Sequence, residues 1–188
     1  MSKKLTIHDI AGFCPEEAIW KMLKDVSTFL IKDDNSCFLS PNSIVIDGKS
    51  FIVDSCTEIR NDYLAPEQNV NQIPNAEQMV WSIGSVAFYM ATGHDIFGGF
   101  GSSYQKEHPM VSLPVLPKGL QELNFVLQKC LCYAPDERLS IKELNRVSIK
   151  GLESCEKRQS KQIGVSKDIP LKEIQNVDDK WPEEMIEI

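Results

Sequence analysis

The sequence lacks any excess of positive charge. It carries 20 lysine and arginine residues against 27 aspartate and glutamate residues, a formal net charge of −7. Surfaces that bind nucleic acid or anionic membranes are rich in basic residues, so neither kind of partner is expected.

The most apolar stretch, residues 80–90, is too short and too interrupted to cross a bilayer. The first ten residues contain two lysines with no apolar region behind them, so they do not resemble a secretory signal.

A framework of paired cysteines is also missing. The six cysteines are scattered along the chain, and without a secretory signal we expect reduced thiols in a cytoplasmic protein. Cys130 and Cys132 lie two residues apart in a predicted helix, which points their thiols in different directions, and no second Cys or His pair follows. We therefore expect no metal and no other cofactor. A redox or metal protein based on Cys37, Cys56 and this pair stays open as an alternative.

The chain does contain clear helical periodicity and one pair of predicted strands. Apolar residues recur with a period of 3.6 after Pro15, which predicts an amphipathic helix over 16–32. Two β-branched runs then flank Gly48 and Lys49, a pattern typical of a β-hairpin.

A central buried helix is predicted over 76–92. Asn75 is placed to cap its start, Gln78 follows three residues later as the second member of a capping box, and Gly93 ends it. The residues between are apolar on nearly every side, which is typical of a helix buried all round.

The second half of the chain predicts further helices and a polar tail. A Gly- and Pro-rich segment, 94–116, holds one short helix near 102–106, and a longer helix follows over 120–132. A last core helix is expected over 141–149, capped by the pair Ser140 and Glu143. The expected fold is therefore mainly α, a helical bundle with a small β-hairpin.

The sequence beyond about residue 150 is polar and only weakly periodic. We therefore expect a domain over 1–150 and a tail over 151–188. The tail is either a disordered terminus or a segment that packs back on the domain. Its candidate contact residues are Trp181, Met185 and Ile186.

Three motifs in this order resemble the C-terminal lobe of a protein kinase. "YLAPEQ" at 63–68 resembles the end of an activation segment, and "MVWSIGSVAFYMATG" at 79–93 resembles the helix through the middle of that lobe. "LQKCLCYAPDERLSIKEL" at 127–144 is similar to its last two helices and the arginine between them. The resemblance covers about residues 16–149 and implies the helical fold of that lobe.

The resemblance fails at the catalytic positions. In the kinase catalytic loop, the proton-accepting Asp corresponds to Phe38, the Lys that steadies the phosphoryl group to Ser40, and the metal-binding Asn to Ser43. A one-residue slip would bring Asn42 to the metal position without restoring an acid or a base. Asp54 matches the metal-binding Asp of the D-F-G motif, but a lone carboxylate is a poor magnesium site.

The upper half of a kinase site has no counterpart in the sequence. Only fifteen residues precede the helix predicted over 16–32, which leaves no room for a glycine-rich phosphate loop, its strand Lys or the partner Glu helix. The acid that opens the central kinase helix is replaced by Met79. Phosphoryl transfer depends on positioning and electrostatic stabilisation, so we expect neither catalysis nor ATP binding.

The structural residues of the kinase lobe are present. The resemblance implies an ion pair between Glu67 of the A-P-E motif and Arg138, and loss of either partner would leave the other charge unpaired. Trp81 is expected to fill the core, and Gly84 to let two helices approach closely.

Two functions follow as expectations. A kinase lobe without catalytic residues resembles the kinase non-catalytic C-lobe (KIND) domain, and "PEEAIWKML" and "FLSPNSIVI" are similar to its opening helix and degenerate loop. The resemblance implies a pseudokinase scaffold that binds a partner protein and is not an enzyme. The alternative is a minimal or split kinase-like phosphotransferase that uses an N-lobe from a separate protein.

Overall fold

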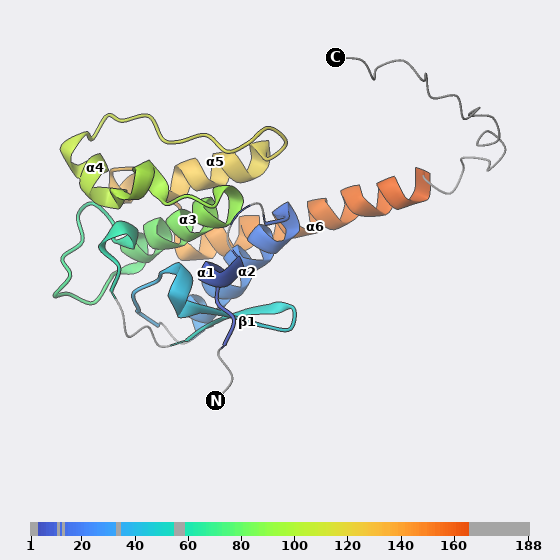
Figure 1. The fold of residues 1–188 in the computed structure, drawn as a ribbon, viewed down its shortest axis with the longest axis horizontal. Helices are drawn as coiled ribbons and strands as arrows, with labels where there is room; N and C mark the ends of the chain where they lie inside the picture. The colour runs from blue at the N-terminus through green and yellow to red at the C-terminus, as the bar shows by residue number, and fades with distance from the viewer. Residues whose placement is uncertain (1–3, 11, 13, 33–34, 55–58, 166–188) are drawn as a thin grey trace, which may run out of the picture. The chain divides into compact units, whose positions relative to one another are not determined.

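The computed structural model describes residues 4–10, 12, 14–32, 35–54 and 59–165, with side chains up to residue 160. The chain divides into two compact units, Met1–Glu156 and Lys157–Ile188. The first is mainly helical with one antiparallel hairpin, as predicted (Figure 1). The elements are α1 (Ile7–Ile10), α2 (Glu16–Lys32), η1 (Pro41–Ser43), β1 (Ile44–Asp47), β2 (Ser50–Val53), η2 (Asn61–Tyr63), α3 (Ala76–Thr92), η3 (Ile96–Gly99), α4 (Gly101–Glu107), α5 (Gln121–Cys130), η4 (Pro135–Glu137) and α6 (Ile141–Val165), the η elements being short 3₁₀ helices.

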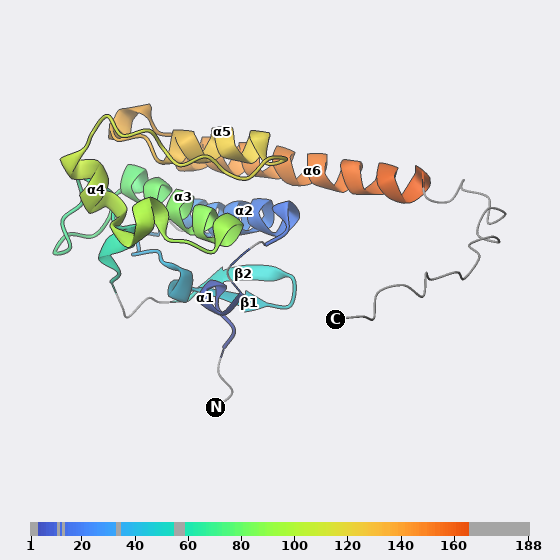
Figure 2. The same ribbon diagram turned by 45° about the horizontal axis from the view of Figure 1, so that its top comes forward.

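The first unit is arranged in layers. Figure 2 shows the hairpin and α1 on one side, α2 and α3 in the middle, and α5 with the first part of α6 on the other side. α2 buries one face, including Ile19, Met22 and Leu23, so the predicted amphipathic helix over 16–32 is confirmed with its bounds. Among the described residues, no helix is both long and apolar enough to cross a membrane.

The hairpin is confirmed, and the N-terminal segment extends it. Val45 faces Ile52 in the antiparallel register, and Gly48 takes the left-handed conformation that the tight turn needs, with φ of 58°. Ile46 donates its N–H to the carbonyl oxygen of Leu5 over 2.8 Å, and Thr6 forms an antiparallel bridge with Val45, so the N-terminal segment pairs with β1. The N-terminal residues thus cover part of the hairpin.

α3 is the buried centre of the first unit. The predicted capping box is present, since Gln78 N–H donates to Asn75 Oδ1 and Asn75 N–H to Gln78 Oε1, each over 2.9 Å. Gly93 ends the helix in the left-handed conformation. At Gly84, an added Cβ would lie 2.8 Å from Cys130 Cβ. The expected close approach of two helices at Gly84 is therefore confirmed, and the second helix is α5.

α5 is shorter than predicted. It occupies Gln121–Cys130 within the predicted 120–132, because Leu120 and Leu131 both have backbone angles outside the helical range. Cys132 consequently lies beyond the helix, whereas Cys130 is its last residue.

α6 is longer than predicted. The expected end at 149 is wrong, because the helix continues to Val165. The first compact unit includes its residues up to Glu156. Its buried stripe continues through Ser148, Gly151 and Cys155. These small side chains carry little hydrophobic signal, yet they allow close packing: a Cβ on Gly151 would lie 2.4 Å from the Trp20 indole. Tertiary packing therefore stabilises a stretch that looks polar in sequence.

Candidate functional site

Two serines occupy the positions that the kinase resemblance assigns to the catalytic lysine and a metal ligand. Ser40 and Ser43 are both buried at the start of the hairpin. The Ser43 hydroxyl donates to the Ser40 carbonyl oxygen and accepts the Ser40 N–H, each over 2.9 Å. The Ser43 hydroxyl is therefore held within a closed turn, where it stabilises the backbone of η1.

Asp54 lies beside Ser43 because of the hairpin register. The Asp54 N–H donates to the Ser43 carbonyl oxygen over 2.9 Å, so the two positions that the resemblance matches to kinase metal ligands are adjacent. The Asp54 carboxylate forms an ion pair with Lys4 Nζ at 2.8 Å. Both side chains are well exposed, 45% for Asp54 and 68% for Lys4. A bound cation would have to compete with this lysine for the carboxylate.

The other positions that the resemblance matches to a kinase catalytic loop offer little chemistry. Phe38, which the resemblance matches to the catalytic base, is a half-buried phenyl ring that can neither accept nor donate a proton. Asn42 is exposed on η1. Met79 is buried in the first turn of α3, so no carboxylate at this position anchors the loop around Ser40. Cys56, one of the residues of the redox or metal alternative, lies outside the described residues.

Glu67 and Arg138 form the ion pair that the resemblance implies. Two guanidinium nitrogens donate to the two carboxylate oxygens over 2.7 and 2.8 Å. Three further donations, over 2.8–3.0 Å, go to the carbonyl oxygens of Cys132, Tyr133 and Glu77. All five N–H donors of Arg138 are thereby used, on a side chain with 0% exposure. The pair ties the A-P-E segment, the start of α3 and the segment after α5 together.

Trp81 packs in the core as expected and also makes a polar link that the sequence did not indicate. Its indole N–H donates to Gln105 Oε1 over 3.0 Å, and Gln105 Nε2 donates to the Leu131 carbonyl oxygen over 2.9 Å. Gln105 is buried on α4. No sequence signal distinguishes it, because an isolated glutamine in a short amphipathic helix ordinarily faces solvent.

A second cluster missed by sequence reasoning surrounds Tyr63. The buried Tyr63 hydroxyl donates to the Asp95 carboxylate, and the Arg60 guanidinium lies 4.9 Å from the Tyr63 ring centre. Arg60 also pairs with Asp62 and Asp95. Burial, reinforced by the Asp95 carboxylate, raises the pKa of Tyr63 above its ordinary value. Tyr63 thus stays a neutral donor that joins η2 to the start of η3.

Cys130 is a buried core residue at the end of α5, and Cys132 is a partly buried residue just beyond it. Burial raises the pKa of the Cys130 thiol to about 12, so it remains protonated at neutral pH. Burial also raises the pKa of Cys132. Among the described residues, no group of three His, Cys, Asp or Glu side chains is arranged to hold a metal ion.

The candidate contact residues Trp181, Met185 and Ile186 lie outside the described residues. Comparison with models of known families finds no match for this chain, and comparison with curated proteins finds no relative.

Proposed function

We propose that this chain is a non-catalytic protein-interaction module, a pseudokinase scaffold related to the C-terminal lobe of protein kinases and similar to the KIND domain. The observation that carries the proposal is a contrast between two sets of positions. The structural pair Glu67–Arg138 is complete, with every guanidinium donor used. The catalytic positions hold a phenyl ring and two hydroxyls instead of a base, a lysine and an amide.

The chemistry of the degenerate site supports the absence of catalysis. Phosphoryl transfer needs a positioned base, metal ligands and cations that stabilise the developing charge. Phe38 cannot act as a base, and the Ser43 hydroxyl is engaged within its own turn. Asp54 is paired with Lys4. One exposed carboxylate with a competing lysine is a weak magnesium site, so we expect no ATP binding.

A cytoplasmic location belongs to the same proposal. Cys14, Cys130 and Cys132 are thiols and not halves of disulfides, which fits a reducing compartment. Fractionation of cells that express the tagged chain tests this directly, and recovery in a secreted or membrane fraction would contradict it.

Thermal unfolding with and without millimolar ATP and magnesium tests the proposal. A nucleotide that binds the folded state raises the midpoint by mass action, so no shift is expected for the wild type. The matched variant is Asp54→Ala, which should give the same null result. A shift that disappears in Asp54→Ala would overturn the proposal and favour the split phosphotransferase.

A further inference from the structure

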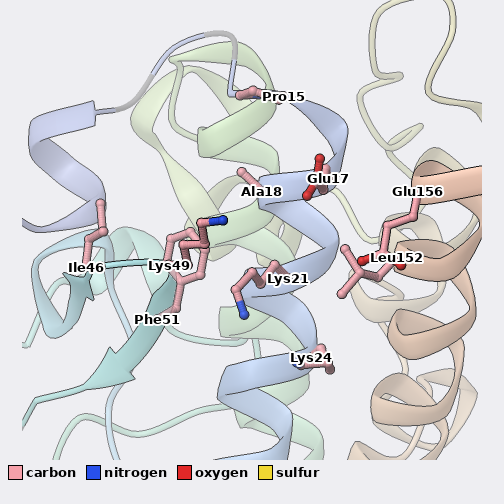
Figure 3. A pocket seen from close by; sticks show the side chains of 11 residues that line it. Pro15, Glu17, Ala18, Lys21, Lys24, Ile46, Lys49, Phe51, Leu152 and Glu156 are labelled. Atoms are coloured by element: carbon pink, nitrogen blue, oxygen red, sulfur yellow. The ribbon is translucent and has the colours of Figure 1, made fainter. Parts of the chain in front are cut away.

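A groove on the first unit lies away from the degenerate catalytic positions. It is formed by α2, the hairpin and the part of α6 before residue 157, and its volume is about 620 Å³ (Figure 3). Its lining includes Ala18 and Lys21 of α2, Phe51 of the hairpin and Leu152 of α6. The volume is within the range of specific binding sites in proteins.

The hairpin end of the groove carries an excess of positive charge. Asp25 Oδ2 lies 3.2 Å from Lys21 Nζ, and Asp25 Oδ1 lies 3.1 Å from Lys24 Nζ, so one carboxylate forms ion pairs with two ammonium groups. The same carboxylate accepts the N–H of Phe51 over 3.1 Å, which fixes it between α2 and the hairpin. Its side chain is only 14% exposed. The two ammonium groups of Lys21 and Lys24 therefore carry one more positive charge than the Asp25 carboxylate neutralises.

Lys49 adds a third ammonium group from the hairpin turn. Across the described part of the chain it has no ion-pair partner, and its side chain extends toward the space between α2 and the hairpin (Figure 3). The other end of the groove, toward α6, is lined by Glu17 and Glu156. On a protein with a net charge of −7, the hairpin end is thus a local basic site.

The floor between the two ends is apolar. Ala18, Ile46, Phe51 and Leu152 are each partly exposed there. Amines beside half-exposed apolar side chains match a ligand that presents carboxylates and large apolar side chains together. A polyanion such as nucleic acid matches less well, because Glu17 and Glu156 would repel its backbone.

We propose that this groove binds an acidic linear peptide with large apolar side chains, with its carboxylates at Lys21, Lys24 and Lys49 and its apolar side chains over Phe51 and Leu152. The inference deepens the proposed function and rests on it, because it takes the chain to be an interaction module and names the chemistry of the partner. It does not depend on whether nucleotide binds near Asp54.

The probe is a fluorescently labelled peptide with the sequence of residues 177–188, VDDKWPEEMIEI. It carries five carboxylate side chains, one lysine and the apolar residues Trp181, Met185 and Ile186. Its control is the same peptide with every Asp and Glu replaced by the amide. Binding is measured by fluorescence anisotropy on the full-length chain at low and high salt.

The decisive variant is Lys49→Glu, with Lys118→Glu as its matched control. Both lysines are exposed in turns, so neither change should disturb folding. Lys49→Glu should weaken acidic-peptide binding about fivefold, whereas Lys118→Glu should change it less than about twofold. The amide peptide should bind weakly to every variant, and salt should weaken the acidic peptide alone.

The outcomes separate the possible occupants. If the peptide binds only when Trp181, Met185 and Ile186 of the chain are changed to alanine, and Lys49→Glu still weakens it, the groove has the proposed specificity and the occupant is the chain's own tail. Equal affinity for wild type and Lys49→Glu overturns the proposal, as does equal binding of the amide peptide or no binding to any variant. An ATP-induced rise in the unfolding midpoint would contradict the proposed function alone.

Discussion

Arg138 and Asp54, two residues that the kinase resemblance singles out, have contrasting surroundings. Arg138 is fully buried and uses five donors on one carboxylate and three carbonyl oxygens. Asp54 is nearly half exposed and pairs with a lysine that is itself mostly exposed. Buried charge networks are costly to break, and exposed pairs are not. The Arg138 network therefore joins separate segments of the first unit, whereas the Asp54 pair lies at its surface.

The largest expected effect is on the Arg138 side. Arg138→Ala should lower the free energy of unfolding by about 3–5 kcal/mol, mainly because three carbonyl oxygens lose their donor, while the Glu67 side chain is 30% exposed and can be solvated. Urea unfolding followed by circular dichroism measures the change. Arg138→Lys should recover only part of the loss, since one ammonium cannot reproduce the bidentate contact. If Arg138→Ala keeps the stability of the wild type, the Arg138 network does not stabilise the fold, and the contrast with Asp54 is wrong.

The next effect concerns the contact between α3 and α5. Gly84→Ala should cost about 1–3 kcal/mol, because the new methyl would lie 2.8 Å from Cys130 Cβ. The same urea titration checks it in a double-mutant cycle with Cys130→Gly, which removes the clashing atom but costs stability by itself. If Gly84→Ala costs as much in the Cys130→Gly background as in the wild type, the close approach to Cys130 does not cause the loss.

A third prediction concerns pH and the buried thiol of Cys130. Its pKa is raised to about 12 in the folded chain from an ordinary value near 9. Between these values the unfolded chain releases the proton first, so stability should fall as pH rises, by at most about 1.4 kcal/mol per pH unit from this group. Below pH 9 the Cys130 thiol should not make the free energy of unfolding depend on pH. Unfolding at pH 8 to 10.5 tests this, and Cys130→Ala should make the fall shallower.

The smallest effect is expected on the Asp54 side. Asp54→Asn should change the free energy of unfolding by no more than about 1 kcal/mol, because the pair with Lys4 is exposed and screened. Lys4→Ala should behave alike, and raising the salt concentration should shrink both differences. A loss as large as that of Arg138→Ala would show that Asp54 is a structural residue and would erase the contrast between the two sites.

Local sequence signals predicted much of the fold. The helix over 16–32, the capping box at Asn75 and the hairpin turn at Gly48 all follow from preferences that act within a few residues. Glu67 and Arg138, far apart in sequence, were paired only through the resemblance, and the structure joins them by two hydrogen bonds.

The candidate site could be predicted only in part. The kinase resemblance predicted that Phe38, Ser40 and Ser43 replace catalytic residues, and this stays a prediction. It did not indicate that Lys4 pairs with Asp54, because the register of the N-terminal segment beside β1 decides that contact. The cluster around Tyr63 and the basic groove around Lys49 likewise join residues from separate elements.

Residue type and short-range spacing were enough to predict the bounds of α2 and α3 and the central place of α3, because amphipathic periodicity and capping act within a few residues. The loss of catalytic side chains stays a prediction of the kinase resemblance. The tertiary structure alone decided that α6 continues to Val165, that Gln105 is buried, and that Lys21, Lys24 and Lys49 share one groove. The physical reason is that small or polar residues carry no strong local preference. Their role depends on the packing partner, as Gly151 against Trp20 illustrates.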